Sequence, residues 1–356
     1  MPPAVKRVEI SKKDGSTRPL GIPTVSDRIA QMVVKMHLEP VCEVVFHENS
    51  YGYRSARSAL MALEQTRKRC WEYFWVLDLD IKSFFDSIPH DLLMKAVKRH
   101  TQEPWILLYI QRWLEAPVQF SDGHLQSNDR GTPQGSVISP MLANLYLHYA
   151  FDDWMKREIP NCPFERYADD IVVHCRTELQ AHYVKKRIKR RLAACGLILH
   201  PEKTRIVYCG NVKIKRHGKG NPLVSFDYLG YTFKPRLMRK RKGRKMSGLV
   251  FTPAVSLKSK KAICARIRSW NLKHRSDMEL NNIASMINPV VRGWLQYYGR
   301  FRKSELYYVL YLLNNHLFKW AQWKYRIKSW KQAIRWFKRV AGNSPNLFVH
   351  WKFVKV

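Results

Sequence analysis

Two short apolar segments that carry acidic residues constrain the fold of this chain most strongly. Phe74 to Ile81 reads FWVLDLDI, with two carboxylates two residues apart in an apolar run. Arg166 to Cys175 reads RYADDIVVHC, where apolar stretches flank an Asp-Asp pair. The first pattern predicts a buried strand, and the second predicts a β-hairpin. Because carboxylates within apolar strands are costly unless a cation compensates them, the two segments together predict a shared cation site.

The candidate metal ligands are Asp80, at the end of the first segment, and Asp169 and Asp170 in the hairpin turn. Mg²⁺ prefers carboxylate oxygens and keeps positions open for substrate phosphates. Two such ions, about 3.5–4 Å apart, can activate a 3′-hydroxyl and stabilise a leaving pyrophosphate. An isolated Asp-Asp pair is more often a solvated turn, but here a second acidic strand and the turn RGTPQGSVISP (130–140) accompany it. The set predicts a two-Mg²⁺ site, with Mn²⁺ as a substitute.

Strands and helices alternate along the first two thirds of the chain. Apolar runs around 205–209 and 226–233 read as further strands, and Val184, Ile188 and Leu192 define one face of a helix from about 179 to 195. Helices are also expected after Pro89 and over 141–155. This alternation predicts an α+β fold, an antiparallel sheet with helices on one face.

The character of the chain changes near residue 250, after which it reads as helical. Ser276 to Glu279 is expected to form a capping box for a helix that begins at Leu280. We therefore expect three parts: residues 1–250, 251–315 and a basic helical tail over 316–356.

Positive charge is concentrated in the second half of the chain. Residues 1–180 carry 22 Lys and Arg against 23 Asp and Glu, whereas residues 181–356 carry 41 against 5. Aromatic residues such as Trp320, Trp323 and Trp336 are interleaved with this charge. Cations neutralise phosphates and aromatic rings stack on bases, so the pattern favours an RNA or DNA partner over solvated helix faces alone.

Composition argues against several other classes of protein. No run of about 18 uncharged apolar residues occurs, so neither a membrane span nor a membrane partner is expected. The N-terminus lacks the apolar core of a signal peptide. The seven cysteines are scattered and form no C-x-x-C pair, which argues against a disulfide framework and a structural zinc site. These features predict a cytoplasmic protein.

The motifs resemble, in chain order, those of bacterial group II intron reverse transcriptases. Tyr167-Ala-Asp-Asp170 resembles the central motif of the family, and INPVVRGWLQYYGRF (287–301) resembles its thumb, or maturase, domain. The remaining matches are KKDGSTRPLGIPTVSDRIAQ (12–31), LDLDIKSFFDSIPHDLL (77–93), RGTPQGSVISPMLANLYL (130–147), CGLILHPEKT (195–204) and FDYLGYTF (226–233). The resemblance implies a right-hand polymerase with partial fingers, a palm and a helical thumb.

The resemblance also implies the roles of single residues. Asp80, Asp169 and, less directly, Asp170 would bind the metal ions, with the Ile81 carbonyl as an additional ligand. Asp80 is chosen because it lies five residues before Phe85, and Asp78, on the same strand face, is the alternative. Lys203 would be the general acid for the departing pyrophosphate.

Four further residues would bind the incoming nucleotide. Lys12 and Arg18 resemble the fingers residues that clamp the triphosphate, and Lys13 could replace Lys12. Phe85 resembles the steric gate that rejects a 2′-hydroxyl, although it could instead be a core aromatic. Gln134 resembles a residue that lines the nucleotide pocket.

The chain departs from the family pattern at both ends. Members usually place further fingers strands and a lid before the equivalent of Lys12, whereas eleven residues precede it here. This departure predicts a weak polymerase. There is no C-terminal Cys-rich or His-Asn-His-type nuclease, so no DNA endonuclease is expected, and residues 316–356 are a candidate DNA-binding segment.

The resemblance implies an RNA-directed DNA polymerase whose partners are an RNA template with a DNA primer, deoxynucleoside triphosphates, group II intron RNA and, as a candidate, target DNA. A retron or diversity-generating reverse transcriptase would share the palm but lack the motif at 287–301. A maturase or RNA chaperone with little polymerase activity is a second alternative, which the retained aspartates disfavour. A viral RNA polymerase is disfavoured by Phe85 and by Ala168 before the Asp pair.

Overall fold

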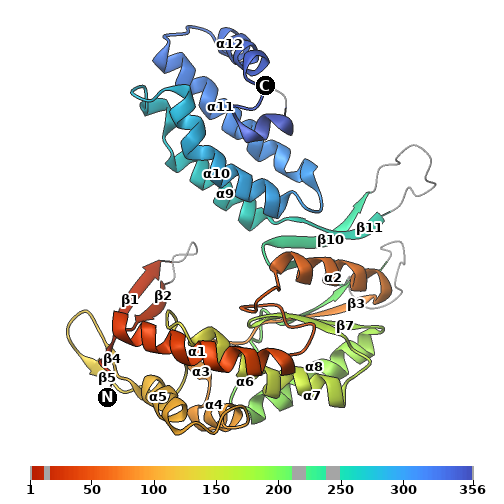
Figure 1. Ribbon diagram of the computed structural model, residues 1–356. Helices are drawn as coiled ribbons and strands as arrows, with labels where there is room; N and C mark the ends of the chain where they lie inside the picture. Colours follow the sequence, from red (N-terminus) through yellow and green to blue (C-terminus); the bar gives the residue numbers. More distant parts are fainter. Residues whose placement is uncertain (1, 12–16, 211–221, 238–248, 355–356) are drawn as a thin grey trace. The chain divides into compact units, whose positions relative to one another are not determined.

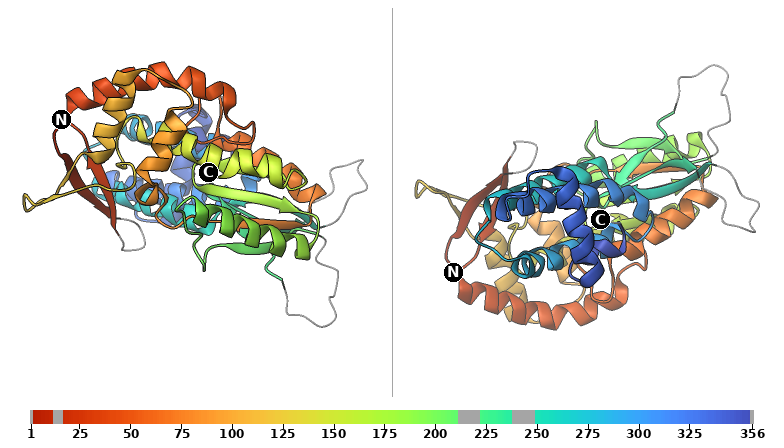
Figure 2. Two further views of the ribbon diagram at one scale, coloured as in Figure 1. Left: turned by 90° about the horizontal axis from the view of Figure 1, so that it is seen from below. Right: turned by 90° about the horizontal axis from the view of Figure 1, so that it is seen from above.

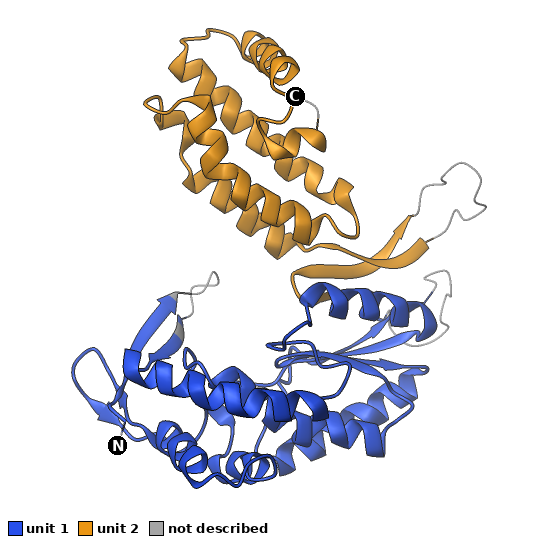
Figure 3. Cartoon of the chain, viewed as in Figure 1, with its two compact units in different colours: residues 1–210, 215–223 blue, residues 211–214, 224–356 orange. Residues whose placement is uncertain are grey.

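The chain divides into two compact units in the computed structural model, which describes residues 2–11, 17–210, 222–237 and 249–354. Unit 1 comprises residues 1–210 and 215–223, and unit 2 comprises 211–214 and 224–356 (Figures 1 and 3). Lys12, Lys13 and the basic stretch 238–248 lie outside the described residues.

A four-stranded antiparallel sheet forms the centre of unit 1. Its order is β6 (Phe164–Tyr167), β7 (Asp170–Cys175), β3 (Trp75–Leu79) and β8 (Arg205–Tyr208). The predicted strand and hairpin are confirmed. Leu79 pairs with Ile171, and Tyr167 pairs with Asp170, so the end of β3 lies beside the hairpin turn.

Helices cover both faces of this sheet (Figure 1). The predicted helix is α8 (Glu178–Ala194), which packs on β3, β7 and β8. Helices α6 (Ser139–Leu147) and α7 (Asp153–Glu158) lie in the same layer. Adjacent strand residues face opposite sides. Accordingly Phe164 packs against Phe151 on this face, whereas Glu165 meets α2 (Ala59–Glu72) on the other face. The α+β architecture is as expected, with α2 added to the second face.

A smaller sheet and several helices complete unit 1. The sheet has the order β2 (Thr17–Ile22), β1 (Val5–Ser11), β4 (Val118–Gln119) and β5 (Leu125–Gln126). Helix α1 (Val25–Val45) follows β2 in the chain and leads toward the central sheet. It follows one edge of the unit in both views of Figure 2. The other helices of this region are α3 (Phe84–Ser87), α4 (His90–Val97) and α5 (Pro104–Glu115).

Unit 2 combines a three-stranded sheet with a helical bundle. The sheet order is β11 (Leu249–Val255), β10 (Tyr231–Leu237) and β9 (Phe226–Tyr228). The main helices are α9 (Leu257–Ser269), α10 (Leu280–Tyr298), α11 (Tyr307–Lys324) and α12 (Trp330–Asn343). Because this sheet packs with the helices, the second compact unit begins at Val224 and not at the expected domain boundary near residue 250. The functional division into 1–250, 251–315 and 316–356 stays a prediction.

The expected capping box at Ser276 to Glu279 is wrong. Helix α10 begins at Leu280, and Glu279 occupies the cap position without a capping side chain. The preceding residues turn instead, with the Met278 N–H donating to the Arg275 carbonyl. Glu279 forms an ion pair with Lys324 of α11, 2.5 Å away. The Glu279 side chain thus takes part in a tertiary contact and not in a cap.

In the part of the chain that the structure describes, no helix combines the length and the apolar character needed to cross a bilayer.

Candidate functional site

A cleft of about 640 Å³ opens where β3 ends beside the hairpin turn. Asp80 follows β3 directly, and Asp169 lies in the turn between β6 and β7. Six of the residues that the sequence singles out line this one cleft: Asp80, Ile81, Phe85, Gln134, Asp169 and Lys203. Residues more than 100 positions apart in the sequence thus meet around one cavity large enough for a small ligand.

Asp80 is held by the segment that follows α8. The His200 N–H donates to the Asp80 carbonyl at 2.7 Å, and the Lys82 N–H donates to the Ile198 carbonyl at 2.8 Å. The same segment carries Lys203, whose Nζ lies 3.3 Å from Asp80 Oδ2. Both side chains are well exposed, so this ion pair contributes little stability. The effect of the ion pair is instead to place the Lys203 cation beside one carboxylate of the cleft.

Asp78 lies on the same strand face but in a different environment. Its side chain is buried, with Arg205 Nη2 3.0 Å from its Oδ2. A guanidinium therefore already compensates this carboxylate, whereas Asp80 opens into the cleft. The geometry favours Asp80 over Asp78 as a metal ligand.

The turn that carries Asp169 has an uncommon backbone. Ala168 has a φ of +57°, a left-handed conformation that non-glycine residues rarely adopt. Gly52 packs so closely against this turn that a Cβ atom there would collide with the Ala168 backbone. Two hydrogen bonds join the neighbouring backbones, from Tyr51 N–H to the Arg166 carbonyl and from Arg166 N–H to the Asn49 carbonyl. Surrounding structure therefore enforces the conformation that presents Asp169.

A buried charge clamp supports the turn from behind. Arg166 is fully buried and donates from Nε and Nη2 to the two carboxylate oxygens of Asp152, at 2.7 and 2.5 Å. Its Nη1 donates to Asn144 Oδ1 at 2.9 Å and to the Ala168 carbonyl at 3.1 Å. Asn144 in turn donates to the Gly52 carbonyl at 2.6 Å. This network, which we call the Arg166 clamp, connects the turn to two other parts of unit 1.

Phe85 and Gln134 form the opposite side of the cleft. Phe85 is half-buried against Phe84, and its carbonyl accepts from the Thr132 N–H at 2.7 Å. Gln134 donates from Nε2 to Asp86 Oδ1 at 3.3 Å, while its carbonyl accepts from the Gly21 N–H at 2.7 Å. These contacts fix the turn 130–134 between β2 and the segment after β3.

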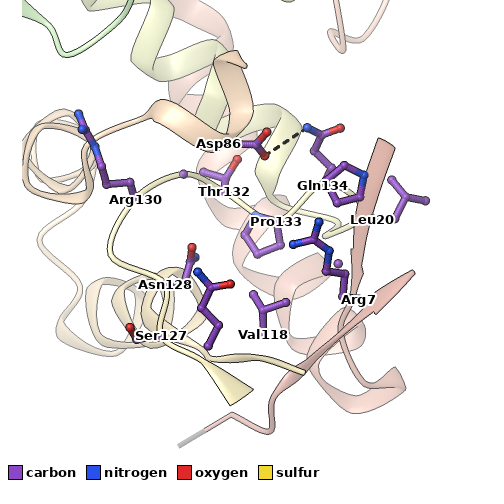
Figure 4. A pocket seen from close by; sticks show the side chains of 14 residues that line it. Arg7, Leu20, Asp86, Val118, Ser127, Asn128, Arg130, Thr132, Pro133 and Gln134 are labelled. Atoms are coloured by element: carbon purple, nitrogen blue, oxygen red, sulfur yellow. Dashed lines mark hydrogen bonds between the residues drawn. The ribbon is translucent and has the colours of Figure 1, made fainter. Parts of the chain in front are cut away.

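A second pocket of about 360 Å³ adjoins the cleft, and Leu20, Asp86 and Gln134 line both. Figure 4 shows the side chain of Arg7 extending from β1 toward Pro133. Arg130 and Asn128 also line this pocket. The turn 130–134 thus borders two neighbouring cavities.

Some predicted site residues do not join the cleft. Asp170 is not among its lining residues. It is the first residue of β7 and follows Asp169 directly, and adjacent side chains along a strand point to opposite sides. Lys12 lies outside the described residues, and for Arg18 the structure describes only the backbone, in β2. Strand β2, which contains Arg18, does reach the cleft, because Thr17 and Pro19 line it.

Tyr53 and His200, which were not among the residues expected at the site, also line the cleft. Tyr53 has a φ of +55°, and its ring lies 6.5 Å from that of Tyr167. The segment SYGYR (50–54), with a glycine between two tyrosines, was the available signal.

The donor set of the cleft fits a hard divalent cation. The carboxylates of Asp80 and Asp169, with the backbone of Ile81 beside them, offer the oxygen ligands that Mg²⁺ prefers. Among the described residues no group of three or more His, Cys, Asp or Glu side chains is close enough to hold a metal. Two carboxylates, those of Asp80 and Asp169, line the cleft, and Mg²⁺ commonly retains its other positions for water and substrate phosphates.

Comparison with known families gives two matches. Residues 10–233 match the family described as reverse transcriptase (RNA-dependent DNA polymerase), and residues 260–338 match the group II intron, maturase-specific domain. The first match contains every residue of the cleft, and the second spans α9 to most of α12.

Individual relatives agree with these matches. Protein YkfC of Escherichia coli is 30% identical over 279 residues, which cover 67% of this chain and 68% of YkfC. The group II intron-encoded protein LtrA of Lactococcus lactis is 36% identical over 148 residues, 41% of this chain and 24% of LtrA. The apo telomerase of Candida tropicalis shares the fold, with a TM-score of 0.53 at 11% identity over 99% of this chain and 67% of that one. The matched segments thus span from a quarter to about two thirds of these proteins.

Proposed function

The chain belongs to the reverse transcriptase family of group II introns, and we propose on this premise that it copies RNA into DNA at the cleft between β3 and the hairpin turn. One observation carries this proposal: six residues with expected catalytic or nucleotide-binding roles, drawn from four separate motifs, line a single cleft. A structural role for each residue separately would not require this convergence.

The two carboxylates of Asp80 and Asp169 would hold Mg²⁺, which when bound lowers the cost of the charge that develops during transfer of the nucleotidyl group. Lys203 would release Asp80 to the metal and donate a proton from Nζ to the departing pyrophosphate, since its ammonium group lies at the same edge of the cleft. Asp170 would act on the metal only indirectly. Lys12 and Arg18 would hold the triphosphate from the fingers hairpin.

Phe85 and Gln134 would position the sugar and base of the incoming nucleotide. Phe85 is fixed by Phe84 and by the Thr132 hydrogen bond, so its ring offers a rigid surface to the 2′ position of the sugar. The adjoining pocket, with Arg7 and Arg130, would receive the template strand next to the nucleotide. The turn 130–134 would then separate template from nucleotide.

Unit 2 would bind RNA, including the intron RNA. Residues 224–356, which make up most of unit 2, carry 29 Lys and Arg against 4 Asp and Glu. Exposed aromatic side chains, among them Tyr308 and Trp323, are available for stacking on bases. Together with the maturase-specific match, this favours a second role in assisting splicing and mobility of the intron, with target DNA as a further partner.

Primer extension tests the polymerase proposal. The full chain is supplied with Mg²⁺ and a DNA primer annealed to an RNA template, with either deoxynucleotides or ribonucleotides. We expect extension with deoxynucleotides and little with ribonucleotides. Binding of the primed RNA without any extension would refute the polymerase and leave the maturase role.

Replacement of Phe85 by Ala should relax the choice of sugar. Removal of the ring opens space for one oxygen atom at the 2′ position, so ribonucleotide incorporation should rise by roughly tenfold to a hundredfold, the range of one small steric contact in a pocket. Phe151→Leu is the control, because Phe151 is a phenylalanine buried against Phe164 that does not line the cleft. If Phe85→Ala polymerises with the selectivity of the parent, the ring is only a core aromatic.

A further inference from the structure

A basic groove lies in the helical layer of unit 1, separate from the catalytic cleft. Its first lobe has a volume of about 560 Å³ between α4, α8 and the chain that joins α6 to α7. Its second lobe, of about 980 Å³, extends toward the end of α1. Arg99, Tyr149 and Asp153 line both lobes, so the two form one continuous groove. The groove and the catalytic cleft have no lining residue in common.

The lining of the groove is strongly cationic. Lys95 and Arg99 are exposed and lie four positions apart, Lys95 in the last turn of α4 and Arg99 two residues beyond its end, and both line the first lobe. Arg157, Arg191 and Lys156 also line it. Its acids are Asp153, which pairs with Arg157 at 3.2 Å, and Glu48. The groove therefore holds five Lys and Arg against two acids, and four of the five cations belong to residues 1–180, which carry 22 Lys and Arg against 23 Asp and Glu.

Two of the arginines are fixed in place. Arg191 donates from Nε to the Ala150 carbonyl at 3.1 Å and from Nη2 to the Tyr149 carbonyl at 2.9 Å. Arg99 lies over the ring of Tyr149, 5.1 Å from its centroid. Guanidinium groups that are already oriented lose less freedom when they bind phosphate. The groove is thus partly preorganised for an anion.

The wall between these arginines has a rare backbone. Residues His148–Asp152 form a π-helical turn between α6 and α7. Such turns are uncommon and occur frequently at functional sites. The wider turn exposes the Tyr149 and Ala150 carbonyls to Arg191 and presents the Tyr149 ring to the groove.

His100 also lines the groove, and its Nε2 lies 2.8 Å from the Tyr149 hydroxyl. Burial and, to a smaller extent, the charge of Arg99 lower the pKa of His100. The charge of the groove at neutral pH therefore comes from Lys and Arg.

We propose that this groove binds the sugar-phosphate backbone of RNA, as a contact separate from unit 2 and from the template-primer path. This proposal rests on the proposed function, because it gives the RNA partner of that function a second site on the protein. The cations would neutralise consecutive phosphates, and Tyr149 would contact the sugar or base between them. A continuous groove of two lobes suits a strand better than a single small anion.

The experiment compares two charge reversals in the full chain. Lys95→Glu with Arg99→Glu alters the groove, and Lys186→Glu with Arg190→Glu is the matched control, since these exposed residues are also four positions apart, on α8, but do not line the groove. The probe is a single-stranded RNA of 4-thiouridine-containing random sequence, titrated at several salt concentrations, with photocrosslinks mapped by mass spectrometry.

The groove variant should bind RNA roughly tenfold more weakly. The slope of log affinity against log salt should fall by about 1.4, because two contacts on a single strand contribute about 0.7 each. Crosslinks near Tyr149 should disappear in the groove variant only. Equal losses in both variants, or no loss in the groove variant, would overturn the proposal. If millimolar pyrophosphate abolishes the crosslinks near Tyr149 but an excess of RNA without 4-thiouridine does not, the proposal would also be overturned, in favour of a small-anion site.

Primer extension on a short template separates this proposal from the proposed function. Lys95 and Arg99 do not line the cleft, so the groove variant should extend a short primed template at the parental rate. Parental RNA binding by the groove variant refutes the groove alone, whereas absence of extension by the parent refutes the polymerase alone.

Discussion

Replacement of Asp169 by Asn is expected to abolish primer extension while leaving RNA affinity nearly unchanged. Asp169 and Asp80 are the two carboxylates of the cleft, and an amide offers a metal only one neutral oxygen. Loss of metal stabilisation removes several kcal/mol from the transition state, which corresponds to about a thousandfold or more in rate. RNA affinity should persist, because the excess positive charge lies after Gln180. The measurement pairs single-turnover extension with filter binding on one preparation.

The matched control for this variant is Asp170→Asn. Asp170 is the next residue, it belongs to β7, and it does not line the cleft. We expect the Asp170 variant to lose less activity than the Asp169 variant under the same conditions. Equal loss of RNA binding and extension in Asp169→Asn would mean that the change disrupts the fold. A larger loss in Asp170→Asn would reverse the assignment of the two residues.

Replacement of Arg166 by Met should destabilise unit 1 and weaken its metal site together. The change leaves the Asp152 carboxylate buried without its guanidinium, at a cost of about 3–5 kcal/mol in the free energy of unfolding. It also removes the donor to the Ala168 carbonyl, so the turn with Asp169 is held less rigidly. Displacements of about 1 Å can reduce rates about a hundredfold. Arg166 acts here as a positioning residue, and we expect a higher Mg²⁺ requirement in extension and weaker Mn²⁺ binding without nucleotide.

A neighbouring ion pair provides the control for Arg166. Glu165 is equally buried on the adjacent strand position and faces the other side of the sheet, where Arg69 lies 2.5 Å away. Arg69→Met should therefore lower stability without changing Mn²⁺ affinity. Arg166→Lys, which keeps the charge but not the fork of donors, should fold better than Arg166→Met and still bind Mn²⁺ less tightly. If Arg69→Met weakens Mn²⁺ binding as much as Arg166→Met, the clamp has only a structural role.

The elements with strong local patterns could be predicted from the sequence. The strand expected over 74–81 is β3 at Trp75–Leu79, and the helix expected over about 179–195 is α8 at Glu178–Ala194. Gly196, which follows the end of that helix in the sequence, has a φ of +70°. Apolar periodicity and the steric freedom of glycine act over a few residues, so these features are visible without the rest of the fold.

The supports of the site could not be predicted in the same way. Arg166 reads as a surface residue until the fold brings Asp152 and Asn144 to it, and buried arginines are rare. The contact of Gly52 with Ala168 joins residues more than 100 positions apart. The capping signal at Ser276 to Glu279 formed no cap, since α10 begins at Leu280 and the Glu279 side chain pairs with Lys324 instead. The contacts of Arg166 and Gly52 are long-range, so a local sequence pattern does not reveal them.

We propose above all that Asp80 and Asp169 together form the catalytic metal site of an RNA-copying polymerase. The most direct test is single-turnover incorporation of one deoxynucleotide on a primed RNA template by Asp80→Asn and by Asp78→Asn. The two residues lie on one face of the same chain segment, but Asp78 is buried beside Arg205 whereas Asp80 opens into the cleft. We expect a loss of about a thousandfold or more for Asp80→Asn. For folded Asp78→Asn we expect a loss below about tenfold, that of one hydrogen bond. Near-parental incorporation by Asp80→Asn would contradict the assignment of Asp80 to the metal site.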